Sequence, residues 1–294
     1  MREVAPHLPI LRSLEIEDCD HQSFIIFPLL KEIGKSTRQL ERLKISFIKN
    51  ISGFLNEQYP NPKVNFPSLR QLEITNWYGE MPPIKCPKLE TLKIDDSETI
   101  TGRDVWKVIK GSLRLSAINF HSFLFEQPFP TRAHLPQNAA LRSLSMSWVD
   151  DDEEGTTCPK VCMLLMESSP NLVHLNLSIV TANHFRYLPP ATMLPRLRHL
   201  GIEFILHREQ FPQNQAMGWI RHVLYSATGV QDLRIIARDN RLDIGWIVGI
   251  LISGSTNPNI PYPPCPRLSS FAVTGTAIDR GLMHQLWLQR GWTQ

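Results

Sequence analysis

A short phrase recurs along the chain, with apolar residues at positions i, i+3 and i+5. Its clearest copies are FPSLRQLEI at residues 66–74 and CPKLETLKI at residues 86–94. The i+3 and i+5 residues alternate as in a short strand with one buried face, and residue i turns inward from the approach to that strand. Such a strand is not stable alone, so the copies are expected to stack on one another.

Ten copies of the phrase occur in the 294 residues. Their residues at position i are Leu11, Leu40, Leu69, Leu89, Leu115, Leu141, Leu172, Leu197, Val230 and Leu268. Proline stands two residues before i in six copies, where its fixed φ and missing N–H suit a bend that leads into a strand. The first segment between copies, 24–35, predicts a short helix that begins near Pro28, and later segments predict helices at 103–110, 159–167, 214–226, 242–253 and 280–289. The interval from Ile74 to Leu89 has room only for a loop or a single turn.

Three copies carry a family resemblance: CPKLETLKI at 86–94, CPRLSSFAV at 265–273 and SSPNLVHLNL at 168–177. The pattern resembles the leucine-rich repeats of F-box proteins, including fungal ones, over essentially the whole chain. The resemblance implies an α/β leucine-rich repeat solenoid, a curved right-handed horseshoe of about ten irregular repeats with a parallel sheet on its concave side. We expect a single repeat domain over residues 1–294, with residues 279–290 as a C-terminal capping helix.

Two features depart from the family pattern. The family's buried Asn or Cys at i+8 is matched only by Cys19, and Trp77 takes that position in the third copy. The F-box, a three-helix module ahead of the repeats, does not precede the first copy. Because a terminal repeat exposes an apolar face unless something covers it, we expect the chain to be a piece of a longer protein or to dock a partner at its N-terminal end.

Composition narrows the possible partners and the compartment. The 31 basic and 28 acidic residues leave a net charge of +3, too mild to predict binding to nucleic acid or to a membrane surface. The longest apolar run, Ile244–Ile252, is too short to span a bilayer. Five scattered cysteines do not form a disulfide framework, which predicts an intracellular protein of the cytoplasm or nucleus.

Residues that alternate with the buried strand positions should point to the concave face. The i+4 positions hold Glu15, Lys44, Glu73, Lys93, Asn119, Ser145, Asn176, Gly201, Arg234 and Ala272. The i+6 positions hold Glu17, Ser46, Thr75, Asp95, His121, Ser147, Ser178, Glu203, Ile236 and Thr274. These two columns suit the recognition of a polar protein surface, although an ordinary solvated face would have the same composition. We select Glu15, Lys44, Glu73, Lys93 and Asp95 as candidate protein-binding residues.

Large aromatic residues lie just past several strands, and the candidate binding set includes four of them: Trp77, Tyr78, Trp148 and Phe204. Exposed tryptophan and tyrosine are enriched at binding hot spots, so these residues could form a rim of the interaction surface. Alternatively, they fill space left by the missing buried Asn or Cys, and this second interpretation is favoured for Trp77.

Other clusters give little sign of chemistry. The acidic run Asp150–Glu154 is typical of a solvated loop, with a basic partner as the alternative. Cys158, Cys162 and His174 are too few for a structural zinc site, so buried cysteine is favoured and no metal is expected. No phosphate-binding glycine loop, nucleophile elbow or HxxxH pair occurs. We therefore expect no cofactor and no catalysis.

These features predict a protein-recognition module. The resemblance implies the substrate-binding repeats of an F-box-type ubiquitin ligase adaptor, which would contact a Skp-type adaptor only if an F-box lies upstream. Alternatives are a free-standing repeat scaffold, the repeat region of a plant-type immune receptor and, more remotely, an enzyme. Repeat faces vary without changing the fold, so the sequence does not name the partner.

Overall fold

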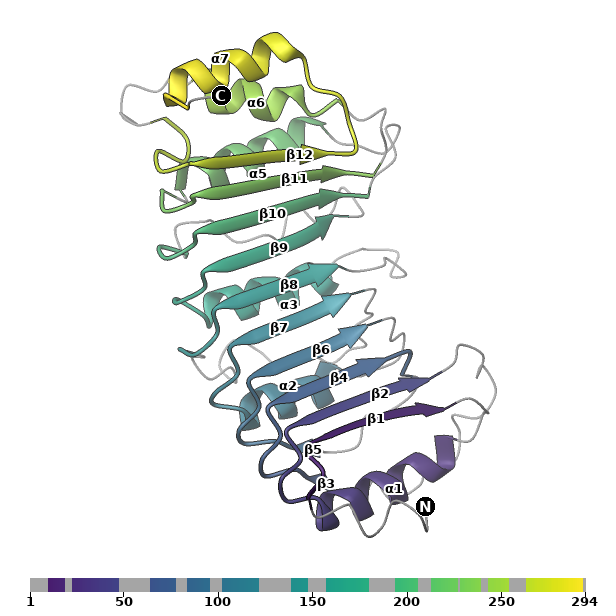
Figure 1. Ribbon diagram of the computed structural model, residues 1–294. Helices are drawn as coiled ribbons and strands as arrows, with labels where there is room; N and C mark the ends of the chain where they lie inside the picture. The colour runs from purple at the N-terminus through teal and green to yellow at the C-terminus, as the bar shows by residue number, and fades with distance from the viewer. Residues whose placement is uncertain are drawn as a thin grey trace. The chain divides into compact units, whose positions relative to one another are not determined.

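The computed structural model describes residues 10–18, 23–47, 64–77, 84–95, 102–121, 139–147, 157–179, 194–205, 213–226, 228–238, 243–253 and 263–292. The chain forms two compact units, residues 1–141 (unit 1) and 142–294 (unit 2). Ten parallel strands follow one another in the order of the chain, five in each unit (Figure 1). This confirms the predicted α/β architecture of stacked repeats, because each strand coincides with one copy of the sequence phrase.

Unit 1 is built on five parallel strands. They are β1 (Ser13–Asp18), β2 (Arg42–Phe47), β4 (Gln71–Thr75), β6 (Thr91–Asp95) and β7 (Ala117–His121). Their register pairs equivalent positions of the phrase, so Leu43 lies opposite Leu72 and Leu72 opposite Leu92. Two helices, α1 (Ser23–Ser36) and α2 (Gly102–Gly111), accompany the strands.

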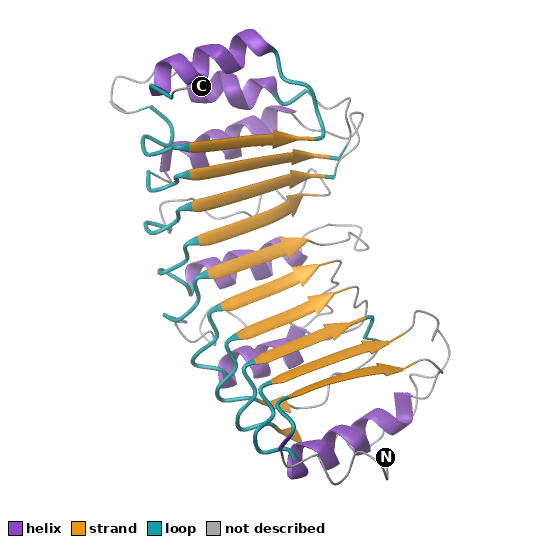
Figure 2. Ribbon diagram, viewed as in Figure 1, coloured by secondary structure: helices purple, strands orange, loops and turns teal. Residues whose placement is uncertain are grey.

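Unit 2 repeats this plan with β8 (Ser143–Ser147), β9 (His174–Ile179), β10 (His199–Phe204), β11 (Asp232–Ala237) and β12 (Ser270–Thr274). The register again matches position with position, and Leu175, Leu200 and Leu233 lie side by side. Its helices are α3 (Thr157–Glu167), α5 (Gln213–Ser226), α6 (Gly245–Ser253) and α7 (Arg280–Arg290). In Figure 2, α3 and α5 lie on one side of the strands of this unit and α7 lies beyond β12, and no described helix of the unit covers the other side of the strands.

A β-turn before the strand explains the recurrent proline. The N–H of residue i donates to the carbonyl of residue i−3 in seven copies, for example from Leu69 to Phe66 (3.3 Å) and from Leu89 to Cys86 (3.1 Å). Proline two residues before i therefore occupies the second position of the turn, where its fixed φ is favoured. The side chain at i−3 is buried in these copies, as at Phe66, Cys86 and Ser112.

The turns are also tied to one another along the chain. The carbonyl of Arg12 accepts from the N–H groups of Glu41 (2.8 Å) and Arg42 (3.0 Å), and the carbonyl of Arg70 accepts in the same way from Glu90 and Thr91. The same double acceptance recurs at Arg142 and Arg198 in unit 2. Within each unit, backbone hydrogen bonds thus fix the start of each strand to the start of the next.

The core consists of the i, i+3 and i+5 side chains with the inward residues of the helices. Leu43, Leu72 and Leu92 in unit 1 and Leu200 in unit 2 are each at most 1% exposed. The corresponding residues of β1 and β12 are only partly buried. Each interior strand therefore gains its burial from the neighbouring copies, as the stacking argument predicts.

Two local predictions were wrong. The first helix begins at Ser23, five residues before Pro28, and not near it. A proline removes one intrahelical hydrogen bond but does not prevent residues ahead of it from being helical. The interval between Ile74 and Leu89 contains a two-residue strand, β5 (Ile84–Lys85), which pairs in parallel with β3 (Val64–Asn65). Equivalent residues ahead of two neighbouring turns are brought together by the stacking, so even this short interval forms a ladder.

The last helix lies at the predicted position in the chain and is capped at both ends. Asp279 Oδ1 accepts from the N–H of Leu282 (3.0 Å), and Gly291 ends the helix in the left-handed conformation with φ of 66°. Leu286 is fully buried. Arg290 donates to the carbonyls of Pro264 (2.6 Å) and Cys265 (3.1 Å), which fixes α7 to the turn before β12. These contacts suit the predicted capping role.

Candidate interaction surface

The outward face of unit 1 carries a ladder of alternating charges. The strand register brings Glu15, Lys44, Glu73 and Lys93 side by side, one from each of four adjacent strands. Lys44 Nζ donates to a Glu15 carboxylate oxygen, and Lys93 Nζ donates to Glu73 Oε1 at 2.9 Å. The i+4 column thus forms one continuous row whose charges balance.

Asp95 extends this ladder to the second column. Its carboxylate lies 3.7 Å from Lys93 Nζ and 3.1 Å from Nδ1 of His121 on the neighbouring strand. Hydrogen bonds with Glu15 and Glu73 raise the pKa values of Lys44 and Lys93 respectively. Both lysines therefore stay charged at neutral pH. A partner would have to match a fixed, alternating pattern, because the face offers no block of one sign.

The outward face of unit 2 holds a different group of residues. The register aligns His174, His199, Asp232 and Ser270, one on each of four neighbouring strands. The two imidazole rings stack with their centroids 4.2 Å apart and their planes 5° from parallel. Asp232 Oδ1 accepts from Ser270 Oγ (2.8 Å), and its Oδ2 lies 3.5 Å from His199 Nδ1. Arg234 Nε lies 3.3 Å from the same oxygen.

The electrostatics of this group follow from its packing. Burial, and then the neighbouring His199, lower the pKa of His174. Burial of Asp232 opposes ionisation, but hydrogen bonds from Ser270 and His199 and the charge of Arg234 outweigh it and lower the pKa of that carboxyl group. The row therefore presents an anchored carboxylate beside a stacked pair of aromatic rings.

A second cluster lies in the i+6 column. Glu203 accepts through Oε2 from Ser178 Oγ and through Oε1 from Arg238 Nε, both at 2.6 Å. Between the two clusters, a Cβ on Gly201 would lie 2.2 Å from Asn176 Oδ1, so the Asn176 amide fills the space that this glycine leaves open. Gly201 thus makes room for the side chain of Asn176 on the neighbouring strand.

The structure divides the predicted aromatic rim. Trp77 is 2% exposed and Phe204 is fully buried, so both side chains belong to the interior and offer no contact surface. For Trp77 this confirms the favoured interpretation, since the indole occupies the position of the family's buried Asn or Cys. Tyr78 and Trp148, like the acidic run Asp150–Glu154, lie outside the described residues.

The described side chains that the sequence suggested for metal binding do not converge. The described residues contain no group of three histidine, cysteine or acidic side chains that could hold a metal ion. Cys162 lies in the interior and His174 on the outward face, so the two do not converge. Burial raises the pKa of Cys86 and of Cys265 to about 12, which keeps these thiols protonated and unreactive. Ser270 donates to a carboxylate and not to a histidine, so it lacks the base that activates a nucleophile.

The prominent residues of unit 2 lie outside the two columns, i+4 and i+6, that were predicted to form the surface. His174, His199, Asp232 and Ser270 all occupy i+2, which points to the same side of a strand as i+4. The alternation of side chains along a strand would have been sufficient to find them. The signal in the sequence was a histidine at i+2 in two neighbouring copies, His174 and His199.

Compared with known protein families and with curated protein sequences, the chain has no match in either comparison. The likeness to leucine-rich repeats therefore rests on the phrase and on the parallel strands it forms. No helix within the described ranges combines the length and the apolar character needed to cross a membrane.

Proposed function

We propose that this chain is a protein-recognition module and that the outward faces of its strands bind the partner. The register of the strands supports this proposal: it places polar side chains in straight rows, with neighbouring strands about 4.8 Å apart. Ion pairs and hydrogen bonds already hold many of these side chains, among them Lys93, Glu203 and Asp232. Many of these side chains are already ordered before a partner binds. Binding would therefore cost less side-chain conformational entropy, which favours affinity.

The family resemblance sharpens the proposal. The chain would be the substrate-binding repeat region of an F-box-type ubiquitin ligase adaptor, acting without cofactor or catalysis in the cytoplasm or nucleus. A Skp-type adaptor would be a partner only if an F-box is encoded upstream of residue 1, and the repeats would then choose the substrate. A free-standing scaffold and the repeat region of an immune receptor are the alternatives, and they use the same surface.

Site-specific photo-crosslinking tests the binding face. A photo-reactive residue is placed at position 119 or 176, both on outward faces, and as a control at 107 or 221 on helices α2 and α5. We expect the outward positions to capture one and the same protein in cells, with little capture at the helix positions. Equal capture at all four positions, or capture only from the helices, would contradict the proposal.

The ligase assignment has its own test. The complete transcript is translated, and its product is assayed for binding to purified Skp-type adaptor, with residues 1–294 alone as the control. We expect the complete product to bind and the repeats alone not to bind. If the transcript encodes no F-box and its product does not bind, the ligase assignment fails and the scaffold function remains.

A further inference from the structure

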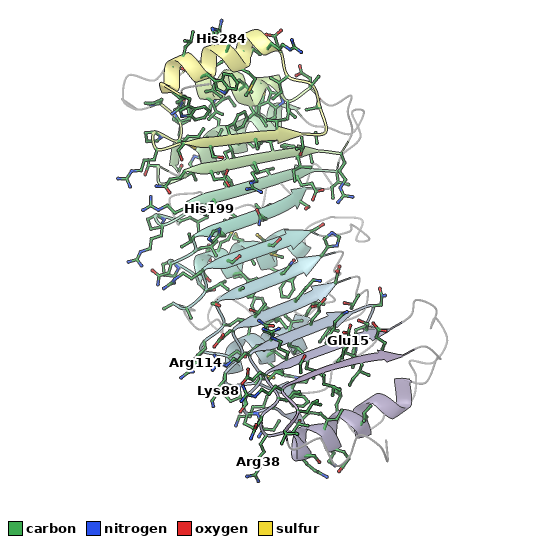
Figure 3. All side chains as sticks on the ribbon, in the orientation of Figure 1. Glu15, Arg38, Lys88, Arg114, His199 and His284 are labelled. Carbon is green, nitrogen blue, oxygen red and sulfur yellow. The ribbon has the colours of Figure 1, made fainter. Side chains whose placement is uncertain are left out.

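In unit 1 the strands begin along an edge that carries three cationic side chains without a carboxylate partner among the described residues. Arg38, Lys88 and Arg114 lie in the turns before β2, β6 and β7, and all three are exposed. Figure 3 shows them along the same edge of the unit. We call this set of turns, residues 10–12, 37–41, 66–70, 86–90 and 112–116, the turn edge of unit 1.

The acids of the turn edge are already engaged. Glu90 Oε1 accepts from Arg70 Nη1 at 2.9 Å, and Glu41 Oε1 lies 3.9 Å from Arg12 Nη1. Five basic and two acidic residues share this edge, so it carries a net charge of +3 from three basic side chains in excess. The outward face of the same strands, in contrast, balances its lysines with glutamates. Among the described strands and turns of unit 1, the excess of positive charge therefore lies in the turns.

Two apolar side chains lie on the same edge. Ile10 is 69% exposed and Leu113, next to Arg114, is 78% exposed. Few large hydrophobic residues of the described ranges are exposed to this degree, and these two are at opposite ends of the turn edge. A ligand for this edge would therefore combine negative charge with aliphatic side chains.

The backbone of the turn edge is held in place. The carbonyls of Arg12, Glu41, Arg70 and Glu90 each accept two N–H groups from the following copy, at 2.8–3.0 Å. Ser112 Oγ adds a hydrogen bond to the carbonyl of Cys86 at 3.1 Å, which joins the last two turns. Binding would thus have to order only the long basic side chains, so less entropy is lost.

We propose that the turn edge of unit 1 binds an acidic, leucine-containing segment of a partner protein in an extended conformation. Strands are about 4.8 Å apart, so the edge from Arg38 to Arg114 crosses three intervals, roughly 14 Å, which about five extended residues span. This inference rests on the proposed protein-recognition function but uses a surface distinct from the outward faces.

Nucleic acid fits this edge less well. Glu41 and Glu90 lie among the cations and would repel phosphates, and the described residues of the edge include no exposed aromatic side chain on which a base could stack. An acidic peptide can place its carboxylates around these two glutamates, because its charges are spaced by side-chain choice and are not fixed by a phosphate backbone.

The test measures binding of a fluorescein-labelled peptide of three Leu-Glu-Glu-Asp repeats to the full chain by fluorescence anisotropy. The edge variant combines Arg38→Ala, Lys88→Ala and Arg114→Ala. The matched control combines Lys31→Ala, Lys107→Ala and Lys110→Ala on α1 and α2, which removes the same charge elsewhere in unit 1. Circular dichroism and urea unfolding check that both variants fold.

We expect the edge variant to bind at least about tenfold more weakly and the control variant to bind within about twofold of the wild type. Leu113→Ser should weaken binding by about fivefold. Equal loss in the two triple variants, or no binding by the wild type, overturns the proposal. Tighter binding of an oligothymidine of equal charge, lost in the edge variant, would assign the edge to nucleic acid instead. Crosslinking at positions 119 and 176 reports on the outward faces independently, so either proposal can fail alone.

Discussion

The outward faces of units 1 and 2 are built on the same register yet hold together by different interactions. In unit 1, Glu15, Lys44, Glu73 and Lys93 alternate in one row of long charged side chains. In unit 2 the same column contains the small residues Ser145, Asn176 and Gly201, and the neighbouring column carries stacked histidines and a multiply bonded carboxylate. The inward positions therefore define the repeat, while the outward positions differ in side-chain size, charge and contacts from one unit to the other.

The largest expected effects concern what the units share. Leu72→Ala in unit 1 and Leu200→Ala in unit 2 should each lower the free energy of unfolding by about 2–5 kcal/mol, because both side chains are 1% exposed. Urea unfolding measures the change. Leu113→Ala, at a site that is 78% exposed, is the control and should stay within about 0.5 kcal/mol of the wild type. A loss near zero at either buried leucine would mean that the two units are not built alike.

The next prediction concerns the cluster around Asp232, which is present on the outward face of unit 2. Asp232→Asn in unit 2 should cost about 1–2 kcal/mol, because the carboxylate is partly buried and has contacts with Ser270, His199 and Arg234. The free energy of unfolding at neutral pH measures it. Ser145→Ala, a smaller change on the same face, is the control. An unchanged free energy of unfolding would show that the contacts of Asp232 do not stabilise the fold.

A smaller effect is expected from the charge ladder of unit 1. Lys93→Met should lower the free energy of unfolding by about 0.5 kcal/mol, since the ion pair with Glu73 is partly exposed. At about 1 M salt, where the Debye length is roughly 3 Å, the difference should nearly vanish. The Asp232→Asn effect should persist better at high salt. Identical salt responses of the two variants would remove the proposed contrast between the faces.

The smallest effect is a pH dependence specific to unit 2. Folding lowers the pKa of His174 from its ordinary value of 6.5, so below that pH the unfolded chain binds a proton that the folded chain resists. The free energy of unfolding should therefore decrease as the pH falls from 6.5 through the lowered pKa of His174 in the folded protein. His174→Gln should flatten the dependence of stability on pH in that window. Chemical shifts of the His174 ring would give its titration directly.

Much of the fold could be predicted because the inward positions of the phrase also determine how successive copies align. The i+3 and i+5 residues had to share a buried face, and successive copies could bury that face only by pairing in parallel. The helix at 280–289 was equally readable, since Asp279 can cap its start and Leu282 and Leu286 have helical spacing. The start of the first helix and the β3–β5 ladder were not, because both depend on how neighbouring copies stack and not on local preference.

The candidate surface was predictable in part. The positions of Glu15, Lys44, Glu73, Lys93 and Asp95 followed from the period of two, and their adjacency followed from parallel pairing. Their mutual ion pairs required the register in three dimensions. Phe204 was assigned to a rim and proved to be buried, because the sequence does not reveal where a strand ends and the next inward position begins.

The sequence by itself determined the repeat: which residues form strands, which face inward and where proline introduces the turn. These properties are set by side-chain alternation and by the backbone limits of individual residues. Only the tertiary structure decided which outward residues meet, and so placed His174 on His199 and joined Asp232 to Ser270 across intervals of 25 and 38 residues. The length of each intervening segment is irrelevant to that meeting, since hydrogen bonds between strands fix the register whatever the chain does between them.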